Sequence, residues 1–247
     1  RSVVVNNNEY ITDNVILAIG HSARDTFEML YKKGVNIIQK PFAMGVRIEH
    51  KQDMINRAQY GDFAKYLPAA DYKLVAHLPN GRSAYTFCMC PGGVVVAAAS
   101  EENRVVTNGM SYYLRDRENA NSALLIGINT EDFGSDYVLA GVEMQRSLES
   151  NAFVAGGSNY NAPVQKVGDF IKNVPSTNVG NVLPSYRPGV KYTDIRTVFP
   201  DFMNESFVLA LNEMDKKIKG FACDDAIMTA VESRSSSPVR ITRGENY

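Results

Sequence analysis

The sequence predicts an α+β protein, built as a small antiparallel β barrel or sandwich with an inserted helical subdomain. Three observations favour this class. Short β-branched and aromatic runs follow one another between residues 41 and 135, with tight turns between them. Longer helical patterns fill residues 136–220, and strand-like runs return after residue 220. A chain that leaves a β layer for helices and later rejoins it has an α+β architecture.

The first forty residues predict two strands and a helix. Val3–Val5 and Val15–Ile19 are β-branched apolar runs separated by polar turn residues. Gly20-His21-Ser22 follows the second run, and residues 25–33 then have helical character up to a stop at Gly34. This arrangement suits a ligand, because the first backbone N–H groups of a helix are unpaired. It is equally the way in which any α/β unit turns a corner.

Residues 41–135 predict the β-rich part. Gly45–Glu49 alternates between apolar and polar residues, as a half-buried strand does. Tyr72–Leu78 and Ser83–Met89 flank Asn80-Gly81, and Asn-Gly is the strongest short-range signal for a hairpin turn. The same dipeptide at Asn108-Gly109 predicts a second tight turn. The remaining predicted elements are a helix at Met54–Tyr60 and strands at Val94–Ala98 and Ala123–Ile128.

Residues 136–220 predict the helical insert. The expected helices are Tyr137–Ala155, Pro163–Lys172 and Asp201–Lys219. Pro163 suits the first turn of a helix, because the N–H that proline lacks has no partner there anyway. Asp201–Lys219 has the clearest apolar face, and Gly220 ends it. The chain then returns to two strands, Ala226–Val231 and Val239–Ile241.

Composition and charge exclude several function classes. The 247 residues include 26 basic and 27 acidic side chains, for a net charge of −1. A nucleic-acid binder needs clustered Lys and Arg, so we expect no nucleic-acid partner. The longest apolar run, Val94–Ala99, is far shorter than the roughly 20 residues of a membrane-spanning helix, so we expect no membrane partner. Three cysteines without a secretion signal predict a reducing, cytoplasmic location.

Cys88-Met89-Cys90-Pro91-Gly92-Gly93 is the most unusual local string. In a regular strand the thiols of Cys88 and Cys90 would share one face, because side chains alternate with a period of two. They could act as a redox pair, or one could be a thiolate nucleophile with a lowered pKa. Alternatively, both are small core side chains at the end of a strand. We expect no metal site, because the sequence lacks a second Cys or His pair at zinc spacing.

Three polar residues are candidates for orienting an anionic or carbonyl group: Arg47, Asn108 and Arg240. For Arg47 the alternative is a side chain on the solvated surface of the strand that contains Arg47–His50. Arg240 follows a run of serine hydroxyls and precedes Arg243, and a guanidinium can bind phosphate or carboxylate through two hydrogen bonds. Equally, both arginines can belong to a polar loop that leads into a half-exposed strand. The sequence contains neither the glycine pattern of a dinucleotide-binding site nor that of a P-loop.

Five longer strings stand out when the sequence is taken as a whole: Ala18–Thr26, Lys40–His50, Phe87–Gly93, Asn108–Ser111 and Glu232–Ile241. Together they resemble the uncharacterised FAD-dependent dehydrogenases of bacteria, and the resemblance covers essentially the whole chain. In such flavoproteins a Rossmann-like FAD domain is made from sequence-distant pieces. A β-rich and helical domain inserted between these pieces covers the flavin and the substrate.

The resemblance implies that this chain is the inserted part with short flanks, cut from a larger protein whose missing FAD-binding segments it contacts. It implies a remnant of the FAD-binding α/β domain at 1–40, a β-rich domain at 41–135, a helical insert at 136–220 and return strands at 221–247. The residues implied to contact FAD in the full-length parent are Gly20, His21, Ser22, Ser237, Pro238 and Arg240. Because the glycine-rich fingerprint is absent, we expect the chain alone to bind FAD weakly or not at all.

Two hypotheses for the function follow. The first is a cap or substrate domain of an FAD-dependent oxidoreductase, inactive by itself, whose small-molecule substrate contacts Arg47 and Asn108. Cys88 and Cys90 are then the candidate catalytic thiols. The alternative is a non-catalytic module that binds a ligand or a partner. A parent with a glycine-rich start and a closing segment favours the enzyme, and a parent without them favours the module.

Overall fold

The computed structural model describes residues 2–244; Arg1 and residues 245–247, at the outer margins of the predicted segments 1–40 and 221–247, lie outside the described residues. A seven-stranded sheet forms its centre. The strands, in spatial order, are β11 (Val190–Tyr192), β10 (Ala162–Lys166), β12 (Ile227–Glu232), β4 (Phe42–Lys51), β9 (Asn119–Ile128), β6 (Ser83–Cys90) and β5 (Val75–His77). Only the β10–β11 pair is parallel within this sheet. The α+β class is confirmed, but the closed barrel is wrong, because β11 and β5 remain the two edges of the described sheet.

The main core lies on one face of this sheet. Along β4 the side chains of Phe42, Met44, Val46 and Ile48 enter the core, whereas Arg47 and Glu49 point to the other face, as the period of two requires. The core is closed by helices α2 (Gln52–Tyr60), α3 (Ala140–Ala155), α4 (Val167–Ile171) and α5 (Asp201–Asp215), with 3-10 turns η1 (Gly61–Tyr66), η2 (Thr130–Phe133) and η3 (Ile195–Val198) between elements.

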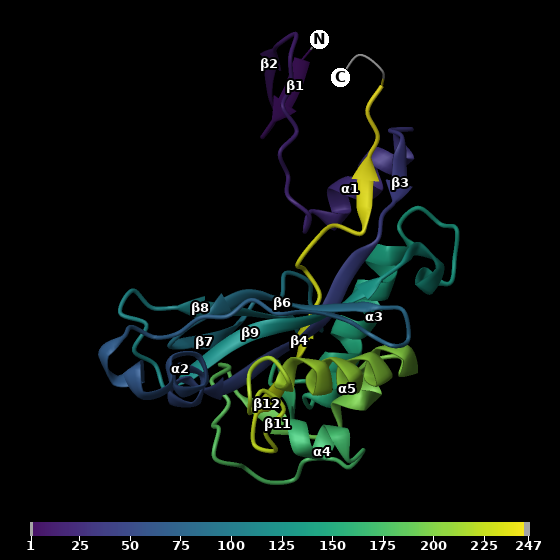
Figure 1. Cartoon of the computed structure of the whole chain (residues 1–247). Coiled ribbons are helices and arrows are strands. Elements are labelled where there is room, and N and C mark those ends of the chain that lie inside the picture. Colours follow the sequence, from purple (N-terminus) through teal and green to yellow (C-terminus); the bar gives the residue numbers. More distant parts are fainter. Residues whose placement is uncertain (1, 245–247) are drawn as a thin grey trace.

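A two-stranded ribbon, β7 (Gly93–Ala97) and β8 (Thr107–Ser111), covers part of the opposite face (Figure 1). β8 lies against β4, β6, β9 and β12. The predicted turn at Asn108-Gly109 is therefore wrong: Asn108 pairs with Val96 and Gly109 with Val95 inside the ribbon. A local Asn-Gly signal for a turn is overridden here, because Gly109 packs closely onto the sheet beneath it.

A small lobe extends from the sheet where the chain enters and leaves it (Figure 1). It contains α1 (Arg24–Lys32), β3 (Ile37–Gln39) and β13 (Val239–Ile241), and it has its own apolar cluster with the start of α3. The hairpin of β1 (Ser2–Val5) and β2 (Asn8–Ile11) projects beyond this lobe. The strand predicted at Val15–Ile19 is wrong: these residues are irregular and Ile16 is 93% exposed, because none of the strands within residues 2–244 pairs with them.

The segment predicted as the helical insert contributes both helices and strands. The helix expected from Pro163 is only partly present, since Ala162–Lys166 forms β10 and the helix α4 begins at Val167. β10 pairs with β12 and so extends the same sheet that residues 41–135 begin. The domain boundaries at residues 41, 136 and 221 stay a prediction. In contrast, α5 and the β5–β6 hairpin form where the sequence predicts them.

Candidate functional site

A cluster of polar side chains is buried between the sheet and the β7–β8 ribbon. Arg47 on β4 lies at its centre and is fully buried. Its Nε and Nη2 donate hydrogen bonds to Asn121 Oδ1 on β9, at 3.1 and 2.5 Å. Nη2 also donates to the carbonyl of Cys88 at 2.9 Å and approaches Cys90 Sγ at 3.6 Å. The remaining nitrogen, Nη1, lies 3.5 Å from Glu232 Oε2 at the end of β12.

Two irregularities in the strands bring these groups together. In β12 the register shifts between Ala230 and Glu232, so Ala230 and Val231 both enter the core and Glu232 reaches the face of Arg47. In β6 one extra residue intervenes, because Phe87 lies opposite Ala123 and Cys90 lies opposite Asn121. Bulges of this kind re-aim side chains, and they recur beside functional sites.

The second bulge separates the two cysteines. Cys88 lies within the bulge, with a φ of 42°, and its side chain is exposed, whereas Cys90 is buried against Arg47. The expectation that both thiols share a strand face is therefore wrong. Burial raises the pKa of both thiols, although the Arg47 charge opposes this shift. A raised pKa keeps the thiols protonated near neutral pH, which favours packing over a nucleophilic role.

Gly109 explains why the ribbon can lie so close to Arg47. A Cβ at this position would stand 1.9 Å from Arg47 Nη2 and 2.4 Å from Asn121 Oδ1. Any side chain at this position would therefore force Arg47 or Asn121 to shift, and glycine lets the two backbones approach closely. Asn108, the predicted substrate residue beside it, is exposed on the outer side of β8, and its Oδ1 accepts from the backbone N–H of Gly109. The structure thus brings together Arg47 and the Cys88–Cys90 segment but leaves the Asn108 side chain outside the cluster.

Glu232 is unusual among the acidic residues. Its carboxylate is 5% exposed and its Oε2 has no hydrogen bond within the described structure. Burial raises the pKa of Glu232 to about 7, although the Arg47 charge opposes the shift. A carboxyl group with this pKa can both accept and donate a proton near neutral pH.

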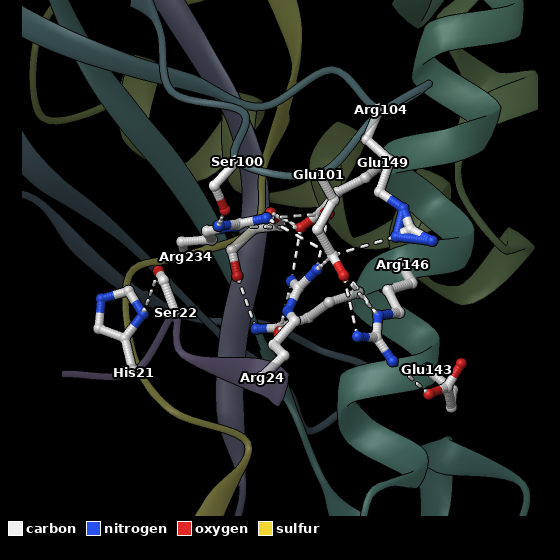
Figure 2. A network of polar contacts seen from close by, with 12 residues as sticks. His21, Ser22, Arg24, Ser100, Glu101, Arg104, Glu143, Arg146, Glu149 and Arg234 are labelled. Atoms are coloured by element: carbon white, nitrogen blue, oxygen red, sulfur yellow. Dashed lines mark hydrogen bonds and ion pairs between the residues drawn. The ribbon is translucent and has the colours of Figure 1, made fainter. Parts of the chain in front are cut away.

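A second polar network joins the lobe to the sheet domain (Figure 2). Arg24, at the start of α1, forms a two-pronged pair with Glu149 on α3, at 2.7 and 2.9 Å. The same guanidinium lies 2.5 Å from Glu101, which also binds Arg146. Burial alone would raise the pKa of Glu149, but Arg24 and hydrogen bonding by Ser233 hold it below its usual value. This network fixes α1 against α3.

The residues predicted to contact FAD lie on two segments of the lobe. Gly20, His21 and Ser22 precede α1, and Figure 2 shows His21 and Ser22 to one side of the Arg24 network. Burial and the nearby charges of Arg234 and Arg24 lower the pKa of His21. On the other segment the carbonyl of Pro238 accepts from the backbone N–H of Lys40, and Ser237 bonds locally to Val239.

Arg240 pairs with Ile38 between β13 and β3. Its side chain is exposed, and it lines an open pocket of about 530 Å³ together with Arg243.

These residues do not by themselves make a site for a whole FAD molecule. A pyrophosphate is usually held by free N–H groups at a helix N-terminus. Here α1 begins with Arg24, which is turned inward to Glu149, and Asp25 places a carboxylate in the first turn. That negative charge lies where the phosphates would need positive potential. Within residues 2–244, the chain thus offers at most part of an FAD site.

Glu232 and Asn121 were not identified from the sequence as members of the Arg47 cluster. The Arg24–Glu149 ion pair that holds α1 against α3 was not identified either. A signal existed for Glu232, which directly follows the apolar run Ile227–Val231. For Arg24 and Glu149 no local pattern could have helped, because the partners are 125 positions apart.

Residues 2–244 contain no group of three His, Cys, Asp or Glu residues able to hold a metal ion. No helix in this range is long and apolar enough to cross a bilayer.

Comparison of the sequence with known proteins shows the family to which the chain belongs. Residues 41–235 match the family described as FAD-dependent protein, C-terminal domain-like. The chain belongs to this family, so the resemblance to FAD-dependent proteins is confirmed at that level. An uncharacterized protein of Clostridium beijerinckii is 51% identical over 246 residues. That match covers 98% of this chain but 46% of the relative, so the chain spans about half the length of the relative.

Proposed function

We propose that this chain is the substrate-side domain of an FAD-dependent oxidoreductase, closing over a flavin that other segments of a longer protein hold. The observation that carries the proposal is the buried Arg47–Glu232 pair on the ribbon-covered face of the sheet, in a chain that belongs to an FAD-dependent family. A stable fold seldom buries an arginine and a glutamate with unfilled hydrogen-bonding positions, since each unmet group costs free energy. Such groups are typical of sites where a reactant is bound.

The lobe supports a split cofactor domain. Its two segments come from opposite ends of the chain and are joined by the β3–β13 pairing. The segment that leads into the lobe also leaves large apolar side chains in solvent, among them Ile11 in β2 at 90% and Ile16 at 93% exposure. Exposed apolar surface of this kind marks an interaction site. We assign it to the FAD-binding segments of the same protein.

In this proposal Arg47 orients a small-molecule substrate. Asn108 contacts that substrate only where it extends past the edge of the β7–β8 ribbon to the outer side of β8. Gly20, His21, Ser22, Ser237, Pro238 and Arg240 contact the FAD bound by the full-length parent. Cys88 and Cys90 flank the site, and the three unbridged thiols of the chain suit a reducing, cytoplasmic location. The partners are the substrate and the FAD-binding segments, with neither nucleic acid nor membrane.

The test is the flavin content of a full-length protein that contains this chain. We expect the purified protein to be yellow, to show flavin absorbance, and to bleach when reduced. The chain of 247 residues alone serves as the control and is expected to retain little FAD. A folded full-length protein that stays colourless and cannot be reconstituted with FAD would exclude the oxidoreductase and leave the non-catalytic binding module.

A further inference from the structure

Three glutamates are buried among residues 2–244: Glu49, Glu149 and Glu232. Glu49 accepts hydrogen bonds from the backbone N–H and hydroxyl of Ser185 and from Asn119. Glu149 accepts from Arg24 and Ser233. The one ion-pair partner of Glu232 within the described structure is Arg47, whose Nη1 lies 3.5 Å from Glu232 Oε2 without the geometry of a well-formed hydrogen bond. A buried carboxylate is stabilised by the donors around it, and Glu232 has the fewest donors of the three. Burial raises the pKa of Glu49 as well, so a variant of Glu49 is needed as the control for Glu232.

Within residues 2–244, two other atoms of the Arg47 cluster also lack hydrogen-bond partners. Arg47 Nη1 and Asn121 Nδ2 are buried and have no hydrogen-bond acceptor within the described structure. Both side chains are fully buried, so solvent does not satisfy them. Two unused donors and one unused carboxylate oxygen therefore occur in a single cluster between the sheet and the ribbon.

We propose that Glu232 and Arg47 form a proton-exchange pair, in which Glu232 takes up and releases a proton while the permanent charge of Arg47 sets the balance. In the uptake step a proton passes from an O–H or N–H group to Glu232 Oε2, and the electron pair of the broken bond stays on the donor atom. Release reverses the step. Resting on the proposed function, the pair supplies acid–base chemistry to a substrate that must lose or gain such a proton.

The surroundings of Glu232 are consistent with this assignment. The titratable and charged groups that face it are Arg47 from β4 and the thiols of Cys88 and Cys90 from β6. β8 and β9 contribute Gly109 and Asn121, which do not titrate. Because burial raises the pKa of both thiols, they remain neutral while Glu232 titrates, and burial places the pKa of Glu232 itself at about 7.

Infrared difference spectroscopy of the 247-residue chain tests the pair directly, because the carbonyl stretch of a protonated carboxylic acid is distinct from the bands of a carboxylate. Between about pH 5 and about pH 9 we expect one such band to disappear, with a midpoint near neutrality, well above the usual range of a glutamate. Glu232→Gln should remove this band. The matched variant Glu49→Gln should leave it in place, because Glu49 is the other buried glutamate on the same strand face as Arg47.

Variants of Arg47 provide the second readout. Arg47→Gln removes the opposing charge and should move the midpoint upward by about 1 pH unit or more, whereas Arg47→Lys should keep it near the starting value. A near-neutral band that survives in Glu232→Gln, or a wild-type spectrum without such a band, overturns the pair. These measurements need no flavin, so their failure is distinguishable from a colourless full-length protein.

Discussion

Glu149 and Glu232 are both buried glutamates paired with a buried arginine, yet their surroundings push their pKa values in opposite directions. Glu149 receives two hydrogen bonds from Arg24 and one from Ser233, and its pKa is held below the usual value. Glu232 Oε2 lies 3.5 Å from Arg47 Nη1 without the geometry of a well-formed hydrogen bond, and burial raises the pKa of Glu232 to about 7. Arginine pairing alone therefore does not fix the charge of a buried acid; the balance between burial and the donors that face the carboxylate does. Glu49 shows the same balance, because burial raises its pKa even though Ser185 and Asn119 donate hydrogen bonds to it.

The comparison separates a structural pair from a candidate chemical one. The Arg24 network holds α1 to α3, and most of its donors and acceptors are matched. In the Arg47 cluster, between the sheet and the β7–β8 ribbon, two hydrogen-bond donors and one acceptor have no partner within the described structure. Unmatched groups cost stability, and the places where a fold tolerates them are candidates for function.

The largest expected effect comes from breaking the structural pair. Arg24→Ala leaves Glu149 charged and buried without its main partner, so we expect a loss of about 3–5 kcal/mol in the free energy of unfolding. Urea denaturation near neutral pH measures it. Arg57→Ala is the control: it removes an exposed pair with Asp53 on α2 and should change the stability by no more than about 0.5 kcal/mol. Equal losses of unfolding free energy in Arg24→Ala and Arg57→Ala would show that the Arg24 network does not stabilise the fold.

The next effect is the pH dependence of stability that Glu232 imposes. Its pKa is higher in the folded chain than in the unfolded chain, so the folded state binds the extra proton between about pH 4.5 and about pH 7. The stability that this proton provides is complete below that window and is lost as the pH rises through it. The loss amounts to about 3 kcal/mol. The difference in unfolding free energy between the wild type and Glu232→Gln measures it.

The difference is needed because His50 acts in the opposite direction. Burial lowers the pKa of His50 to about 4, so His50 makes stability rise with pH between about 4 and about 6.5. The wild type alone therefore shows a partly cancelled profile, and Glu232→Gln should unmask the rise. A wild-type minus variant difference that stays constant from about pH 5 to about pH 8 contradicts the prediction.

Gly109→Ala tests how tightly the Arg47 cluster is packed, because Gly109 lies on the ribbon strand β8 that covers the cluster. The new Cβ would collide with Arg47 Nη2 and Asn121 Oδ1, so one of them must shift, at a cost of about 1–3 kcal/mol. Gly127→Ala in β9 is the matched control, since its Cβ would meet nothing closer than the carbonyl of Ser83 at 3.6 Å. Thermal melts of both variants measure the contrast, and a neutral Gly109→Ala would show that the cluster is loosely packed.

The smallest effect concerns the thiols. Cys88 is exposed and Cys90 is buried, so alkylation of the native chain should label Cys88 first. The labelling should accelerate as the pH rises above neutrality, because burial raises the pKa of Cys88 and the thiolate is the reactive form. Peptide mass mapping over time follows both sites. Fast labelling of Cys90 at the same rate would show that the ribbon opens.

Much of the architecture could be predicted from local pattern. The alternation of Gly45–Glu49 places apolar side chains on one face and Arg47 on the other, and the β5–β6 hairpin and α5 follow their signals. The strand wrongly predicted at Val15–Ile19 and the helix wrongly predicted to begin at Pro163 have one cause. Whether a β-prone run becomes a strand depends on a neighbour to pair with, and β10 has β12 whereas Val15–Ile19 has none within the described residues.

The sequence by itself determined the α+β class, the family resemblance and the place of Arg47 on the polar face of a strand, because these follow from periodicity and from strings of adjacent residues. The alternation is that of a half-buried strand, so the burial of this face under the β7–β8 ribbon was not predicted. Only the tertiary structure decided what Arg47 meets. A bulge in β6 separates Cys88 from Cys90, and a register shift in β12 turns Glu232 toward Arg47. Register is set by how distant strands dock, so no spacing along the chain encodes that contact.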